Sequence, residues 1–220
     1  MNPMSRSYTR RILLTTLVLA LPGSWSATLA ASLGAFQISA RGDQKLNLST
    51  GRTELPQGGT ATDSKNGLTL TGRTLNYLPG KSLQATGAVI RVLGGGILSA
   101  DTVNYDVASG TLKASGHLTY SSARIRGLSA GTVVLYTVSG AVVASGNVRA
   151  TSPAMSASRV VALNSGRQIL LAGNYTLNTG GPRLADAGSS ARLLLSGDGS
   201  QSVDARPSQA ALRAFAPYLK

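Results

Sequence analysis

The chain is dominated by a sequence unit that recurs about every 30 residues. The segment ADTVNYDVASGTLKASG (residues 100–116) and the segment AGTVVLYTVSGAVVASG (residues 130–146) are identical at 8 of 17 positions. The glycines that end successive copies, Gly87, Gly116, Gly146 and Gly173, are spaced 29, 30 and 27 residues apart. A repeat of this length predicts stacked supersecondary units that share one continuous core.

Each copy has the pattern of a β-hairpin. Two segments of alternating apolar and polar residues flank a turn, and the four turns contain Pro79-Gly80, Ser109-Gly110, Ser139-Gly140 and Ser165-Gly166. Such residue pairs favour tight turns between antiparallel strands. The glycine that ends each copy falls inside the second strand, on its apolar side, where it predicts a bend or a β-bulge.

Alternation also assigns the faces of these strands, because residues two apart on a strand share a face. Lys113 and His117 are expected to point outward, and the apolar residues between them inward. The inward set, expected to line the interior, comprises Leu75, Tyr77, Leu83, Ala85, Val103, Tyr105, Leu112, Ala114, Leu118, Val133, Leu135, Val142, Ala144, Val148, Ile169 and Leu171. Further along the same strands it continues with Val89, Tyr120, Tyr175 and Leu177.

These patterns predict an all-β protein in which repeated hairpins form two sheets around an elongated apolar interior. Alanines at 85, 114, 144 and 162 favour an open slot over a filled core, although the sequence leaves both arrangements open. We expect four segments: a signal peptide at 1–30, a polar segment with a degenerate first copy at 31–70, the β-repeat domain at 71–205, and a tail at 206–220. Ser208 is a candidate N-cap for a short helix in that tail.

The first 30 residues have the three parts of a secretory signal. Arg6, Arg10 and Arg11 precede the apolar stretch 12–21, and small residues follow Pro22-Gly23. This order predicts an exported, periplasmic protein after cleavage near Ala31. The alternative is an uncleaved N-terminal helix that anchors the protein to the inner membrane.

The charge of the chain limits the classes of partner that it is expected to bind. The formal net charge is +13, while aromatic residues are only 5% of the chain, so a surface for stacking nucleic-acid bases is not expected. With no cysteine, disulfides and thiolate metal sites are excluded. Basic residues along the repeat predict contacts with an anionic headgroup, and we select Arg91, Arg124, Arg126 and Arg149 for this role. The alternative is an ordinary solvated face.

Enzyme chemistry has little support in the sequence. Residues 127–131 match the pattern Gly-x-Ser-x-Gly around Ser129, but a nucleophile elbow needs a following helix and a later histidine. The single histidine, His117, precedes it, and a strand is expected to follow. We therefore predict no catalytic residue, no metal site and no cofactor.

The phrase ADTVNYD…GTLKASGHL, together with the ending ASGNV at 144–148, resembles the organic-solvent-tolerance (OstA-like) family. That family includes the periplasmic bridge protein of lipopolysaccharide transport, and the resemblance covers about residues 71–177. It implies a rolled β-jellyroll whose groove holds the acyl chains of lipopolysaccharide or another anionic lipid. It also implies other OstA-like transport proteins as partners, and head-to-tail copies of the chain. The alternative function is a secreted structural or adhesive β-repeat protein without a ligand.

Overall fold

A computed structural model describes residues 31–33, 36–92, 96–197 and 202–219 of the chain. The expected signal peptide at 1–30 lies outside the described residues. Within them, seventeen strands are hydrogen-bonded into one antiparallel sheet, and only short helical turns accompany it. The prediction of an all-β fold is therefore confirmed.

The strands are of two lengths. Ten short strands stand at the two ends of the sheet, and seven long ones, of 9 to 11 residues, form its middle. The short strands are β1 (Ala31–Leu33), β2 (Phe36–Ala40), β3 (Lys45–Asn47), β4 (Arg52–Leu55), β5 (Gly59–Asp63), β6 (Leu68–Gly72), β7 (Thr74–Leu78), β15 (Leu184–Asp186), β16 (Arg192–Ser196) and β17 (Ser202–Asp204). The long strands are β8 (Ser82–Val92), β9 (Gly96–Asp106), β10 (Thr111–Ser121), β11 (Leu128–Tyr136), β12 (Ala141–Thr151), β13 (Ala154–Leu163) and β14 (Gln168–Asn178).

Each long strand bends near its middle and so has two arms. In β8, β10, β12 and β14 the bend falls where the sequence predicted it, because Gly87, Gly116, Gly146 and Gly173 all have positive φ, between 52° and 81°. In β10 the pairing register shifts between Ser115 and Leu118, as a β-bulge requires. These glycines are exposed or half-buried, and so they do not lie on the apolar side of the strand as the alternation had suggested.

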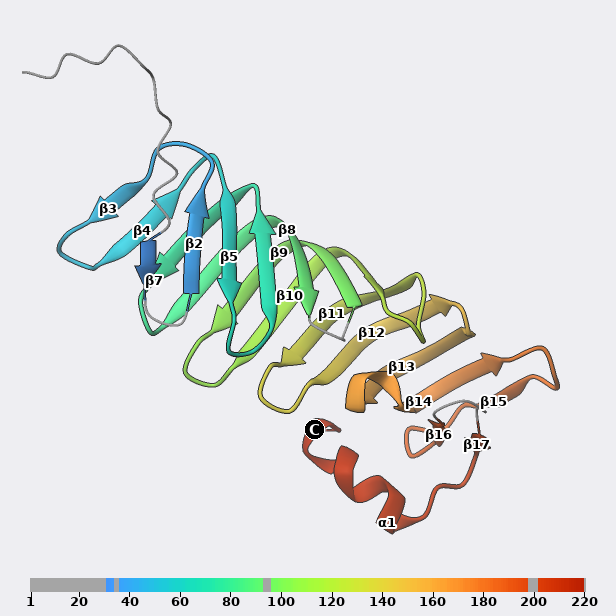
Figure 1. Ribbon diagram of the computed structural model, residues 1–220. Helices are drawn as coiled ribbons and strands as arrows, with labels where there is room; N and C mark the ends of the chain where they lie inside the picture. The colour runs from blue at the N-terminus through green and yellow to red at the C-terminus, as the bar shows by residue number, and fades with distance from the viewer. Residues whose placement is uncertain (1–30, 34–35, 93–95, 198–201, 220) are drawn as a thin grey trace, which may run out of the picture.

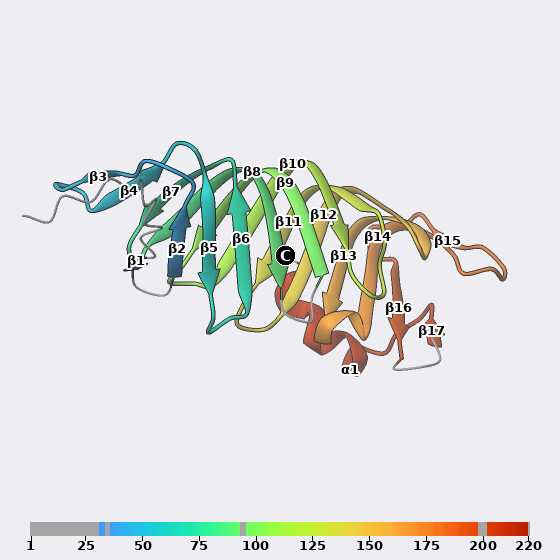
Figure 2. The same ribbon diagram turned by 45° about the horizontal axis from the view of Figure 1, so that its top comes forward.

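The two arms of the long strands belong to different halves of the sheet. The first arm of β8 pairs with β7, and its second arm pairs with β6. The front half-sheet contains β1, β2, β5, β6, β15 and one arm of each long strand, and the back half-sheet contains β3, β4, β7, β16, β17 and the other arm. In Figure 2, β2, β5 and β6 stand in front of the strands of the back half-sheet. The two sheets that the sequence predicted around an interior are thus two halves of one bent, continuous sheet, since every long strand passes through both halves.

The sheet does not close on itself. Within the described residues, β1 and β3 at one end, and β15 and β17 at the other, each pair with a single neighbour. Figure 1 shows these strands at opposite ends of an elongated molecule. Each end therefore presents strand edges whose outer backbone groups have no partner strand.

Most of the apolar side chains lie between the two half-sheets. One cluster of buried residues runs from Phe36 in β2 to Leu195 in β16 and includes residues of both halves. Contacts between strands that share no hydrogen-bonded ladder show that the halves face each other. The ring of Phe36 in β2 stands edge-on to that of Tyr77 in β7, with centroids 5.9 Å apart.

The polar N-terminal segment is part of the same sheet. β4 and β5 are separated only by Pro56–Gly58, and β6 and β7 only by Arg73, so each pair corresponds to one long strand broken at its bend. Together β4 to β7 have the arrangement of one bent hairpin, because β4 pairs with β7 and β5 pairs with β6. That residues 31–70 hold a degenerate first copy stays a prediction. The expected domain boundary at 70/71 falls inside β6, which ties the two segments into one unit.

The C-terminal tail covers the outside of the back half-sheet. Helix α1 (Gln209–Leu212) begins at Ser208, whose hydroxyl accepts a hydrogen bond from the Ala211 amide, and the 3₁₀ segment η2 (Arg213–Tyr218) follows. Phe215 is fully buried in a second cluster against β12, β13, β14 and β16. The predicted cap and helix are confirmed, and the role of the helix as a cover is a new finding.

Candidate functional site

The structure places the predicted lining residues in the interior. Fifteen of the sixteen are buried, with at most 5% of their surface exposed, and Val142 is half-buried against the same cluster. Fourteen of them belong to the back half-sheet; only Leu118 and Val148 lie in the front one. Alternation therefore identified one wall of the interior almost completely.

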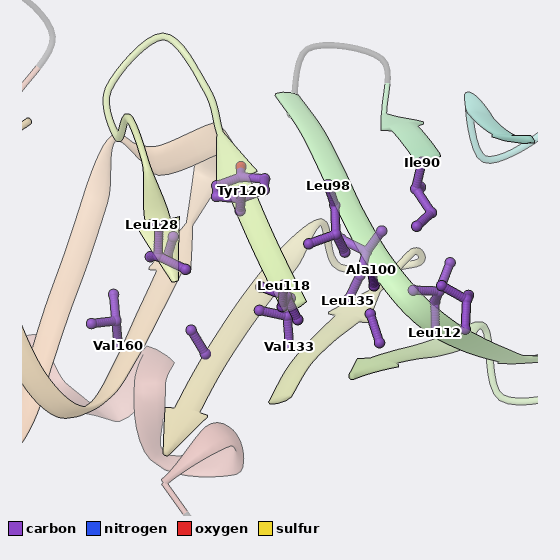
Figure 3. Close-up of a cluster of buried hydrophobic side chains, with 14 of the residues drawn as sticks. Ile90, Leu98, Ala100, Leu112, Leu118, Tyr120, Leu128, Val133, Leu135 and Val160 are labelled. Atoms are coloured by element: carbon purple, nitrogen blue, oxygen red, sulfur yellow. The ribbon is translucent and has the colours of Figure 1, made fainter. Parts of the chain in front are cut away.

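The opposite wall was identified only in part, through the buried residues Leu118, Tyr120, Val148, Tyr175 and Leu177. It consists of front half-sheet residues such as Ile90, Leu98 and Leu128, which are 0 to 4% exposed. Figure 3 shows Leu98, Ala100 and Tyr120 from this wall beside Val133 and Leu135 from the back half-sheet. The signal for this wall was present, because Leu68/Leu70 and Leu98/Ala100 also alternate, but these pairs precede the part of each copy that repeats most clearly.

The interior is filled along most of its length. Ala114 and Ala144, which were expected to leave a slot, are 0% and 1% exposed, and of the four alanines only Ala162 lines the apolar cavity described below. Near Ala85 the packing is tight, since a Cβ added to Gly72 would lie 3.2 Å from the Cβ of Ala85. Alanine at these positions therefore reflects close packing of neighbouring strands.

One apolar cavity, of about 60 Å³, interrupts this packing. It lies between the half-sheets at the side where the strands end in turns, opposite the bends. Its lining residues are Val92, Leu98 and Tyr120 from the front, Val133, Leu135, Gly140, Val142 and Ala162 from the back, and Ser165 and Gly166 from the β13–β14 turn. A cavity that holds benzene is about 150 Å³, so this one is too small for an acyl chain unless the two half-sheets separate here.

One of the four selected arginines stands beside this cavity. A Cβ added to Gly166, which lines the cavity, would lie 3.8 Å from the Cβ of Arg124. Arg167 directly follows in the same turn and is exposed. The cavity thus has an apolar lining, and the Arg124 side chain stands next to one of its lining residues.

The other three arginines lie elsewhere. Arg149 is exposed on the outer face of the front half-sheet, where it pairs in register with Ser129 and Ser156. Arg91 is exposed between the buried Ile90 and the half-buried Val92, and Arg126 lies in the loop before β11, where its amide donates to the Ser152 carbonyl. The expected single rim of arginines is therefore divided, with Arg124 alone of the four next to the cavity.

The interior next to β2 contains a buried polar group. Asp63 is 1% exposed; its carboxylate accepts hydrogen bonds from the amide and side chain of Asn66, at 3.1 and 2.7 Å, and from the Tyr105 hydroxyl at 3.5 Å. Burial is the main reason that the pKa of Tyr105 is raised above 10.0. The buried carboxylate of Asp63 is therefore fully hydrogen-bonded within the fold.

The residues that suggested enzyme chemistry lie on outer surfaces. Ser129 is an exposed residue of β11, so strand residues stand on both sides of it and no helix follows it as a nucleophile elbow requires. His117 points outward, as predicted, with 93% of its side chain exposed. Its Nδ1 lies 2.6 Å from the carboxylate of Asp101 at the bend of the neighbouring strand. Among the described residues no three His, Cys, Asp or Glu side chains form a group able to hold a metal ion.

Comparison with models of protein families gives no match to this chain, and comparison with curated proteins gives none either. None of the helices in the described part of the chain has the length and apolar character needed to span a membrane.

Proposed function

We propose that this protein is a periplasmic carrier or bridge that holds the acyl chains of an anionic lipid, such as lipopolysaccharide, between its two half-sheets. The observation that carries the proposal is the apolar cavity at the side where the half-sheets end, with Arg124 beside it. Each methylene group that enters such an interior gains about 0.8 kcal/mol relative to water. The guanidinium of Arg124 would pair with a phosphate of the headgroup.

The bent architecture is compatible with lipid entry. All seven long strands connect the half-sheets on the bend side, whereas the cavity lies at the opposite side. Small rotations at the glycine bends would separate the half-sheets there and enlarge the cavity. In this proposal the sheet acts as the rolled β-jellyroll of the OstA-like family, which the repeat sequence resembles.

The ends of the sheet support the proposed partners. Strands β1 and β3 at one end, and β15 and β17 at the other, expose edges that could pair with another copy of the chain or with another OstA-like protein. Leu46 and Leu48, at the tip of the β3–β4 hairpin, are 59% and 88% exposed. Head-to-tail pairing would cover these leucines and extend the interior from one copy to the next.

The direct test is to purify the protein under mild conditions and analyse its organic extract by mass spectrometry. We expect an acylated anionic lipid in stoichiometric amount.

A second measurement uses displacement of a fluorescent fatty-acyl probe. Val142→Trp should fill the cavity and weaken probe binding, while Val89→Trp, on the outer face of the front half-sheet, is the matched control. Equal affinity of the two folded variants would contradict the proposal.

A second candidate is a structural or adhesive repeat protein without a ligand. The dense packing of the interior favours it, because fifteen of the sixteen lining residues are already buried against protein. In that case no lipid is extracted, the fluorescent probe does not bind, and no amphiphile changes the unfolding temperature.

A further inference from the structure

A second cleft lies on the outer surface of the back half-sheet, on the other side of the sheet from the apolar cavity. Its volume is about 540 Å³, within the range of small-molecule sites. It lies beside the bends of β12 and β14, and Leu219, after η2, forms part of its wall. The lining residues of this cleft, which the structure describes, include arginine, serine and asparagine but no acidic side chain.

Strand register brings two arginines together on the floor of this cleft. Arg159 of β13 pairs with Ala172 of β14, and Ala172 pairs in turn with Arg192 of β16. Adjacent strands are about 4.8 Å apart, so the two arginine Cα atoms are separated by about 10 Å, with only a methyl group between them. Two long side chains on either side of a small one can converge on the same group.

Both guanidinium groups are positioned by backbone carbonyls. Nη1 of Arg159 donates to the Tyr218 carbonyl at 3.3 Å. Nη1 of Arg192 donates to the carbonyls of Ser189 and Ala191, at 3.0 and 2.6 Å. These bonds use a single nitrogen of Arg192, so its Nε and Nη2 donors can bind another group. Fixed guanidinium groups lose less conformational entropy when they bind an anion.

The surroundings favour a ligand larger than a simple ion. Ala172 is only 5% exposed although it lies on the outer face, which shows that the floor of the cleft is well shielded. Hydroxyl and amide groups of Ser158, Ser189 and Asn174 stand around the arginine pair. Guanidinium pairs bind the oxygens of phosphate, and hydroxyl and amide groups suit the hydroxyls of a sugar.

We propose that this cleft binds a phosphate group, with Arg159 and Arg192 as its two anchors. The phosphate would be either inorganic phosphate or the phosphate of a soluble sugar phosphate. The site is independent of the proposed lipid-binding interior, since its residues face the opposite side of the sheet.

The test is a titration of ¹⁵N-labelled protein with inorganic phosphate and, separately, with glucose 1-phosphate, monitored by NMR. We expect saturable shifts of the Gly173 amide and the Arg192 Nε resonance. Saturation by both probes identifies a simple phosphate site, and saturation by glucose 1-phosphate alone identifies a sugar-phosphate site; either result supports the proposal. Absence of saturable shifts with both probes would overturn it.

Variants separate a specific site from general positive charge. Arg192→Gln should weaken binding by about tenfold, the loss expected for a charge-assisted hydrogen bond. Arg159→Gln should do the same, and thermal unfolding checks that its contact with Tyr218 is not needed for folding. Arg91→Gln removes the same charge from an exposed site on the front half-sheet, and it should change affinity less than about twofold. Equal weakening by all three variants would overturn the proposal.

Discussion

The ring of Phe36 stands perpendicular to the ring of Tyr105, with centroids 5.4 Å apart and an interplanar angle of 89°. Phe36 lies in β2 of the front half-sheet and Tyr105 in β9 of the back one, and no hydrogen-bonded ladder joins these two strands. The contact therefore holds the two half-sheets together at the N-terminal end of the core.

Phe36→Ala should lower the free energy of unfolding by about 3–5 kcal/mol, because the ring is fully buried and touches both Tyr77 and Tyr105. Leu46→Ala is the control, since Leu46 is 59% exposed and should change stability by less than about 0.5 kcal/mol. Urea denaturation monitored by circular dichroism measures both. Similar losses of unfolding free energy in the two variants would show that this contact does not hold the two half-sheets together.

Gly116→Ala should destabilise the protein more than Gly140→Ala. Both glycines have positive φ, 76° and 67°, which costs an alanine about 1 kcal/mol. Only at Gly116 would the added Cβ also meet the Asp101 side chain, 2.8 Å from its Cβ, whereas at Gly140 nothing lies within 4 Å. Denaturant unfolding compares the variants, and equal losses would mean that the bend tolerates a side chain.

His117 should titrate above its ordinary pKa of 6.5. The hydrogen bond that the imidazole donates to the Asp101 carboxylate, and then the charge of that carboxylate, favour the protonated imidazole and raise the pKa of His117. The pair therefore stabilises the fold below pH 6.5, and the stabilisation is lost as the pH rises through the raised pKa. NMR titration of the imidazole proton tests this, with Asp101→Asn as the comparison; an unchanged pKa in that variant would contradict it.

Phe215→Ala should release the C-terminal cover. The ring is fully buried in the second cluster, so we expect the free energy of unfolding to fall by about 3–5 kcal/mol. We also expect faster proteolysis after residue 206. Arg213→Ala, an exposed position in the same segment, should behave like the parent protein. Limited proteolysis followed by mass spectrometry distinguishes the two. Equal cleavage of both variants would indicate that the segment is held by other contacts.

The repeat could be predicted because its physical determinants are local. Turn residues, period-two alternation and mid-strand glycines define each hairpin without reference to the rest of the chain. Val89 shows the limit of aligning copies. It was expected inside, but Ala88 and Ile90 are the buried residues, because β8 pairs with β9 without the extra residue that follows Gly116 in β10.

The sequence also contains a pattern that predicts the second cluster, the one around Phe215. Strands in the first copies alternate, as in Leu75-Asn76-Tyr77, whereas later strands contain unbroken apolar runs such as Ile169-Leu170-Leu171. Continuous apolar character predicts burial on both faces of a strand. By contrast, the cavity beside Arg124 and the cleft beside Arg159 depend on how turns and the tail meet strands far away in the sequence, which no local pattern specifies.

The position of the tail has a consequence for the growing polypeptide. From β8 to β14 every strand pairs with the strand before and after it, so these hairpins can form in the order in which they are synthesised. The outer apolar face of β12, β13 and β14 must wait for Phe215, and Tyr218 reaches back to the Ser139 hydroxyl, 79 residues earlier. During that interval the nascent chain exposes an apolar surface that is prone to aggregation. A chaperone that shields this surface would raise the yield of folded protein.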